Sequence, residues 1–138
     1  MKTKFLFLIF ILNLITNAYG ACKNDEFISR QALLVSMNLN NLYFETELTY
    51  PHANNFLNRI KNVELDAMFL HRITRNGAVT CWQTKSNYSI LQNSSHILQN
   101  YFIQFSSRRN IEPIENDWKI FIESYKKLEI IMQNAREK

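Results

Sequence analysis

Apolar residues recur at helical spacing in four stretches of this chain. Within each stretch they stand mostly three or four residues apart, which places them on one face of an α-helix. Alternation with a period of two persists nowhere for more than a few residues, so the pattern favours helices over strands. The first two stretches follow the helical pattern most regularly: Ile28, Ala32, Val35, Leu39 and Leu42, then Phe56, Ile60, Val63, Ala67 and Leu70.

The third and fourth stretches carry larger side chains. We expect the third helix to bury Ile90, Ser94, Ile97, Tyr101 and Phe105, flanked by Leu91, Leu98 and Phe102. In the fourth helix the same spacing selects Trp118, Phe121, Ile122, Tyr125, Leu128, Met132 and Ala135. Each helix has one apolar face that needs a partner. We therefore predict an all-α four-helix bundle, with helices near residues 24–43, 54–75, 87–105 and 117–135.

The order of the helices in the bundle depends on the connections between them. The predicted connections are about ten residues long and reach at most about 36 Å when extended. The second helix is roughly 33 Å long, so a crossover that makes the first two helices parallel is possible but taut. An up-down-up-down order is favoured, and an up-up-down-down order remains open.

Residues 1–20 have the pattern of a secretion signal. Lys2 and Lys4 precede the apolar run of residues 5–15, and small residues at Ala18 and Gly20 suit cleavage before Ala21. The run is shorter than the roughly twenty residues that span a bilayer, and no later run is longer. We therefore expect a secreted, extracellular protein without a membrane anchor, with one domain at residues 21–138.

Two cysteines and two glycosylation sequences agree with export. Cys22 and Cys81 are the only cysteines, and in an oxidising compartment two cysteines most simply form one disulfide, with an intermolecular bond as the alternative. The chain also carries two N-glycosylation acceptor sequences, beginning at Asn87 and Asn93. A disulfide-bonded glycoprotein is expected.

Charge and residue spacing argue against several functional classes. Removal of Lys2 and Lys4 with the signal leaves 14 basic against 12 acidic residues, so nothing points to nucleic acid. His52, His71 and His96 are widely separated, which disfavours a metal site, and we expect them to be solvated. No set of residues suggests catalysis, a phosphate-binding loop or a cofactor. We predict that the protein is not an enzyme.

Apolar residues on the outer side of the first helix are candidates for partner binding. Leu33, Met37 and Phe44 lie opposite the core residues of that helix. A helix that is apolar on two faces buries the second one against something. Either a receptor binds there, or the following connection, with Leu48, Tyr50 and Pro51, folds over it.

The last helix offers a second candidate contact. Ile130 points away from the predicted core and has charged neighbours, including Glu123 and Lys127. An apolar centre with a charged rim is typical of a binding hot spot. Two basic pairs, at residues 108–109 and 126–127, are candidates for contact with sulfated glycosaminoglycans.

The last helix also carries a family resemblance. The sequence from Asp117 to Phe121, with Leu128 and the segment 132–135, resembles the last helix of interleukin-3-like cytokines. Residues 67–72 are similar to part of the second helix of interleukin-7. The whole chain resembles a short-chain four-helix-bundle cytokine. The resemblance implies an up-up-down-down bundle without cofactors that binds paired cell-surface receptors through the outer faces of its first, third and last helices.

These observations favour a secreted cytokine-like signalling protein that binds cell-surface receptor ectodomains. Two alternatives remain open. One is a secreted helical carrier that encloses a small apolar ligand, which the aromatic content permits. The other is a secreted effector directed at a host. The sequence does not indicate the oligomeric state.

Overall fold

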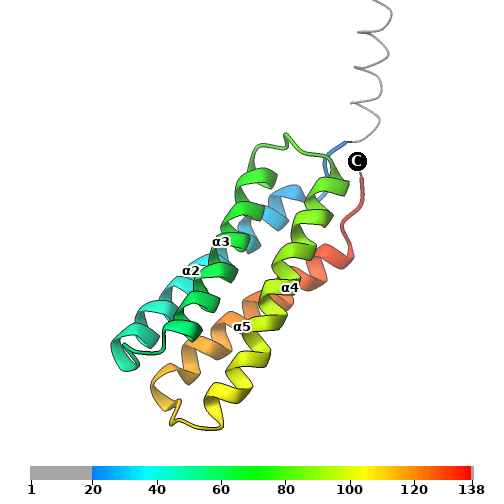
Figure 1. The fold of residues 1–138 in the computed structure, drawn as a ribbon. Helices are drawn as coiled ribbons and strands as arrows, with labels where there is room; N and C mark the ends of the chain where they lie inside the picture. The colour runs from blue at the N-terminus through cyan, green and yellow to red at the C-terminus, as the bar shows by residue number, and fades with distance from the viewer. Residues whose placement is uncertain (1–19, 138) are drawn as a thin grey trace, which may run out of the picture.

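The computed structural model describes residues 20–137, and within them the protein is a bundle of four helices (Figure 1). The helices are α2 (Asp25–Thr49), α3 (Asn54–Arg75), α4 (Cys81–Ser106) and α5 (Glu112–Gln133). Pairing between strands is limited in this range to one isolated bridge between Cys22 and Glu137. The predicted secretion signal lies, except for Gly20, outside the described residues. The predicted four-helix bundle is confirmed.

Consecutive helices run in opposite directions, so the order is up-down-up-down (Figure 1). Helix α2 packs against α3 and α5, and α3 packs against α4. Helices α4 and α5 are joined by stacked rings, so α2 and α4 occupy opposite corners of the bundle. This is the order that short connections favoured. The up-up-down-down order implied by the cytokine resemblance is not the one adopted.

The connections are shorter than predicted, because three helices extend beyond their expected ends. They comprise only residues 50–53, 76–80 and 107–111. Helix α4 begins six residues before its predicted start, at a capping box in which Thr80 and Gln83 bond each other's backbone N–H groups. Helix α5 begins at Glu112, with Pro113 in its first turn, where proline is tolerated. Such short connections join neighbouring antiparallel helices.

The predicted disulfide between Cys22 and Cys81 is confirmed. Their Cα atoms lie 4.5 Å apart and both side chains are buried. The bond joins the start of α2 to the start of α4 across the end of the bundle. Nearby, the Cys81 backbone N–H donates to the Gly20 carbonyl, and the Lys23 N–H donates to the Arg136 carbonyl at 2.8 Å. Both ends of the described chain are therefore fixed at the disulfide end of the bundle.

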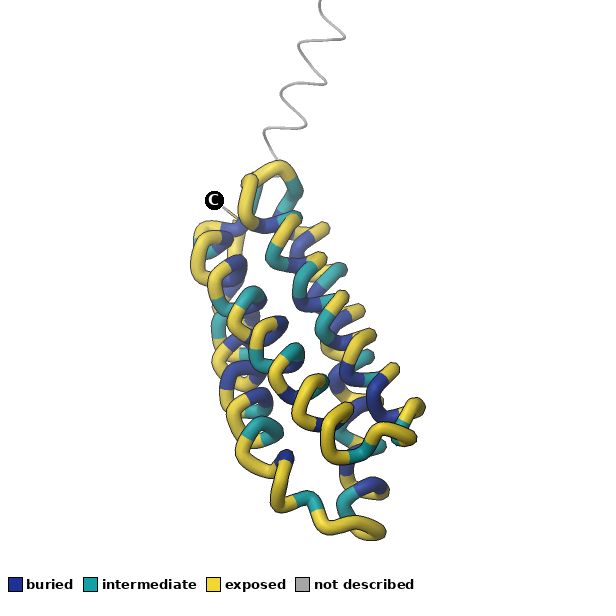
Figure 2. The backbone as a smooth tube through the Cα atoms, turned by 90° about the vertical axis from the view of Figure 1, so that its left-hand side faces the viewer, coloured by how far each residue is buried: buried dark blue, intermediate teal, exposed yellow. Residues whose placement is uncertain are grey.

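The buried residues line the inner side of each helix (Figure 2). Every predicted core residue of α2 and α3 is buried. In α5, Trp118 and Ile122 are only half-buried, whereas the other predicted positions, and Ile114 in addition, are buried. None of the helices in residues 20–137 has the combination of length and apolarity needed to cross a membrane.

The predicted core face of α4 is wrong by about one residue. Ile90 and Ile97 are exposed, and Ser94 and Tyr101 are half-buried. The disulfide turns Cys81 inward, and positions at seven-residue steps from Cys81 remain on the same side of the helix. The buried residues of α4 therefore follow Cys81: Thr84, Tyr88, Leu91, Ser95, Leu98, Phe102 and Phe105.

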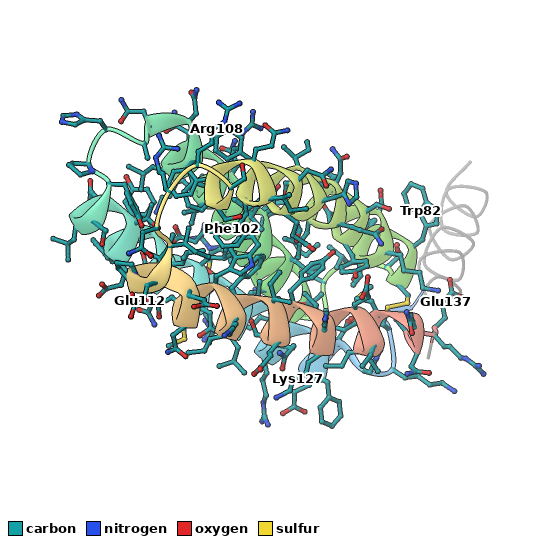
Figure 3. The ribbon with its side chains drawn as sticks, turned by 90° about the horizontal axis from the view of Figure 1, so that it is seen from below. Trp82, Phe102, Arg108, Glu112, Lys127 and Glu137 are labelled. Atoms are coloured by element: carbon teal, nitrogen blue, oxygen red, sulfur yellow. A yellow bond between two sulfur atoms is a disulfide. The ribbon has the colours of Figure 1, made fainter. Side chains whose placement is uncertain are left out.

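Aromatic rings fill the interior at the end of the bundle opposite the disulfide. The ring of Phe56 on α3 lies 4.4 Å from that of Phe105 on α4. The Trp118 ring on α5 stacks on Phe102, which lies between α4 and α5 (Figure 3). Large rings that contact one another in this way leave the centre of the bundle filled by side chains.

Candidate partner-binding surface

The outer side of α2 carries a row of exposed apolar side chains. Met37 and Phe44 are 54% and 53% exposed, as predicted. Leu33 is half-buried instead, because it follows Ser29 by one turn on the side of α2 that faces α3. The sequence missed three exposed members of the row. The row, here named the α2 stripe, consists of Phe27, Leu34, Met37, Phe44 and Leu48.

The connection after α2 does not cover this stripe. Leu48 belongs to α2 and is itself exposed. Tyr50 packs against Phe105 with ring centroids 5.2 Å apart, and its hydroxyl donates to the Asn110 carbonyl. The connection therefore contacts the end of α4 and the α4–α5 loop. The interpretation in which residues 48–51 fold over the α2 stripe is wrong.

The outer side of α5 carries the second predicted contact. Ile130 is 58% exposed, and Glu123 and Lys127 are exposed beside it. Lys127 points away from the bundle in Figure 3. The sequence analysis missed Ile120, which is also exposed. These four residues, Ile120, Glu123, Lys127 and Ile130, are named the α5 patch.

The α2 stripe and the α5 patch border each other. Helices α2 and α5 are joined by two side-chain hydrogen bonds: the Gln31 amide donates to the Ser124 carbonyl at 2.8 Å, and the Asn24 amide donates to the Ile131 carbonyl at 3.0 Å. A shallow groove of about 170 Å³ lies along this line. Its lining includes Leu34 of the stripe and Ile120, Glu123 and Lys127 of the patch. The stripe and the patch therefore meet at this groove, through Leu34 on α2, and together they are named the α2–α5 face.

A larger pocket, of about 610 Å³, lies between the start of α2 and the end of α3. It contains a serine and a histidine in contact: Ser29 Oγ lies 2.9 Å from His71 Nδ1. The same Nδ1 lies 3.0 Å from the Ser29 carbonyl, and Ser29 Oγ donates to the His71 carbonyl at 3.3 Å. The sequence suggested that His71 is solvated. That prediction is wrong, because His71 is half-buried and contacts Ser29.

The Ser29–His71 contact has a structural explanation. An imidazole Nδ1–H that donates to the Ser29 carbonyl leaves the serine hydroxyl to donate to the His71 carbonyl. In this arrangement the histidine does not accept the serine proton, which an activated nucleophile requires. Ser29 is also buried. The pair joins α2 to α3, and we assign no chemistry to it.

A third pocket, of about 180 Å³, lies between α4 and α5 and includes Tyr125, His96 and Glu129. Burial raises the pKa of Tyr88 above its ordinary value of 10.0, and the neighbouring Tyr125 and Glu129 raise it further. Burial likewise raises the pKa of Tyr125, against the lowering effect of the neighbouring Tyr88 and Ser95 side chains. Both phenols are protonated at neutral pH. They contribute polar contacts inside the bundle and no charge.

The remaining predicted sites are dispersed. Within residues 20–137, no three His, Cys, Asp or Glu side chains gather as metal ligands. The two basic pairs lie far apart, because residues 108–109 belong to the α4–α5 loop and residues 126–127 to the second half of α5. Both glycosylation asparagines lie on α4. Asn93 is exposed, whereas Asn87 is half-buried and its amide donates to the Gln83 carbonyl at 2.9 Å.

Comparison with known proteins assigns no relationship: no protein-family model matches the chain, and no curated protein or solved structure is significantly similar to it.

Proposed function

We propose that this protein is a secreted signalling ligand that acts by binding a cell-surface receptor ectodomain through the α2–α5 face. The observation that carries the proposal is the α2 stripe, in which large apolar side chains stay exposed on the side of α2 opposite its buried side. A helix with two apolar faces gains from a partner on the second face. The adjoining α5 patch supplies charged groups at the rim of such a contact.

Export is supported by the secretion signal pattern and by the buried disulfide. Disulfides persist in oxidising compartments and are rare in the cytosol. The Cys22–Cys81 bond closes the end of the bundle at which the described chain begins. The four helices begin after the expected cleavage site, so cleavage before Ala21 removes none of their residues.

The carrier alternative has weaker support. A carrier of an apolar ligand needs an enclosed apolar cavity of several hundred cubic ångströms. The pocket of about 610 Å³ instead has a lining that includes Asp25, Glu26, Arg30 and Arg75. Stacked rings such as Phe102 and Trp118 occupy the space between the helices. The effector alternative differs in having a host molecule as its target, and the sequence does not indicate which molecule that is.

The proposal can be tested by screening the secreted protein against an array of receptor ectodomains. The wild-type chain should bind an ectodomain saturably. Met37→Asp places a charge in the middle of the α2 stripe and should weaken that binding by about 30-fold or more, which corresponds to a hot spot of about 2 kcal/mol. Ile103→Asp is the matched control, because Ile103 is an apolar residue on α4 that is somewhat more exposed than Met37.

Two results contradict the proposal. One is the absence of saturable binding to any ectodomain, and the other is equal binding by the wild-type chain and Met37→Asp. If sedimentation shows a dimer that Met37→Asp dissociates, the α2 stripe belongs to self-association, and the receptor contact is not there.

A further inference from the structure

A second group of exposed apolar side chains lies on α3 and α4, away from the α2 stripe. Phe69 and Leu65 of α3 are 53% and 56% exposed, and Ile90 and Ile97 of α4 are exposed as well. Leu65 and Phe69 are one helical turn apart, and Ile90 and Ile97 are two turns apart, so each pair shares one side of its helix. These four residues are named the α3–α4 patch.

The packing of α3 on α4 sets the two pairs at the same height along the bundle. The Phe56 ring lies 6.1 Å from the Phe102 ring, and the Arg59 guanidinium lies 4.9 Å from the centre of the Tyr101 ring. In antiparallel helices, residues at the same height have numbers that rise along one helix and fall along the other. This register places Phe69 level with Ile90 and places Leu65 level with position 93 of α4.

Position 93 is the asparagine of the second glycosylation sequence. Asn93 follows Ile90 by three residues and precedes Ile97 by four, so it lies between them along the axis of α4 and about 40–60° to one side of them around it. Its side chain is exposed. Asn87, in contrast, is half-buried, and its amide already donates to the Gln83 carbonyl. The apolar patch therefore borders the one acceptor asparagine that is open to solvent among the described residues.

We propose that an N-linked glycan on Asn93 covers the α3–α4 patch. In the transfer, the Asn93 amide nitrogen bonds to C1 of the first N-acetylglucosamine of a lipid-diphosphate-linked oligosaccharide. The bond from C1 to the diphosphate oxygen breaks, the lipid diphosphate leaves with the electron pair, and the amide gives up one proton. The C–H faces of the attached sugars then pack on Ile90, Ile97 and Phe69, and the rest of the glycan screens this side from other proteins.

The inference rests on the exported state in the proposed function and not on receptor binding. It also accounts for a difference between the two apolar surfaces. The α2–α5 face contains neither acceptor asparagine, since both lie on α4 at the opposite corner from α2. A glycan on Asn93 would leave that face open.

The test uses the full chain with its own signal, expressed in cells that perform N-glycosylation. Intact mass of the secreted protein should fall by one glycan in Asn93→Gln. Light scattering should show aggregates of Asn93→Gln that the wild-type protein does not form. Adding Phe69→Lys and Ile90→Lys to Asn93→Gln should restore the monomer, because the patch is then polar without the sugar. Asn87→Gln, which removes the half-buried acceptor asparagine, should remain monomeric.

The outcomes separate the two proposals. A chain that is not exported contradicts the proposed function and the glycan together. A chain that is exported with Asn93 unoccupied contradicts the glycan alone. If Asn93→Gln is exported without the glycan and stays as monomeric as the wild type, the glycan does not cover an apolar liability and the inference is overturned. The inference is also overturned if Asn93→Gln folds but aggregates, and adding Phe69→Lys and Ile90→Lys does not restore the monomer.

Discussion

The Trp118 ring of α5 stacks on the Phe102 ring of α4, with centroids 3.8 Å apart and planes 11° apart. The backbones of α4 and α5 approach each other less closely than those of the other neighbouring helix pairs. Bulky side chains set such distances, and here stacked rings fill the wider space at one end. Tyr88 and Tyr125 occupy it nearer the disulfide. The α4–α5 side is therefore held by aromatic and phenolic contacts.

The buried tyrosines predict a loss of stability at alkaline pH. The pKa of Tyr88 is raised in the folded protein, so above about pH 10 the unfolded chain loses this proton while the folded chain keeps it. The unfolded state then binds fewer protons, and the free energy of unfolding falls by about 1.4 kcal/mol per pH unit for each such tyrosine. Below about pH 10 there is no such slope.

Urea unfolding at about pH 9, 10 and 11 checks this prediction, with the wild-type chain compared to Tyr88→Phe. The variant should lose less stability than the wild type between the two upper values. Equal pH dependence of the two proteins would mean that Tyr88 ionises freely and is not buried as the structure has it.

The disulfide should contribute strongly to stability. Cys22 and Cys81 are 59 residues apart in sequence, and in the loop-entropy model closing a loop of that length stabilises the fold by about 4 kcal/mol. Replacing both cysteines with serine should lower the free energy of unfolding by that amount, measured by urea titration. A non-reducing peptide map should show the two cysteines joined. Two free thiols, or a dimer linked through either cysteine, would be incompatible with the structure.

Ile130 and Phe121 should respond oppositely to substitution, although both are apolar residues of α5. Ile130 is mostly exposed, so Ile130→Asp should change the free energy of unfolding by no more than about 0.5 kcal/mol. Phe121 is fully buried, so Phe121→Ala should cost about 3 kcal/mol or more. Thermal unfolding of both variants measures the difference. If Ile130→Asp unfolds the protein, the residue is part of the core and the α5 patch does not exist.

The helix class, the core of α2 and α3, and the disulfide partners were predictable from the sequence. They depend on local spacing and on the presence of a single cysteine pair. The buried face of α4 was not predictable from the sequence. Its apolar residues form two adjacent rows, one through Leu91 and Leu98 and one through Ile90 and Ile97, and both have helical spacing. The choice depends on Cys81, which the predicted helix start left outside α4.

The candidate surface was predicted in part. Met37, Phe44 and Ile130 could be found because they stand opposite a regular core row on their own helices. The meeting of α2 and α5 could not, since it depends on long-range bonds such as that of Gln31 to the Ser124 carbonyl. The Ser29–His71 pair was missed for the same reason: the two residues lie 42 positions apart.

The most direct test of the account is the dissociation constant of the protein for the proposed receptor ectodomain, measured for the wild type, for Met37→Asp on α2 and for Ile130→Asp on α5. If the two helices present one contact face, each variant should raise the constant by about 30-fold or more while remaining folded. Ile103→Asp on α4 should leave it unchanged. Equal constants for the wild type, Met37→Asp and Ile130→Asp would contradict the account.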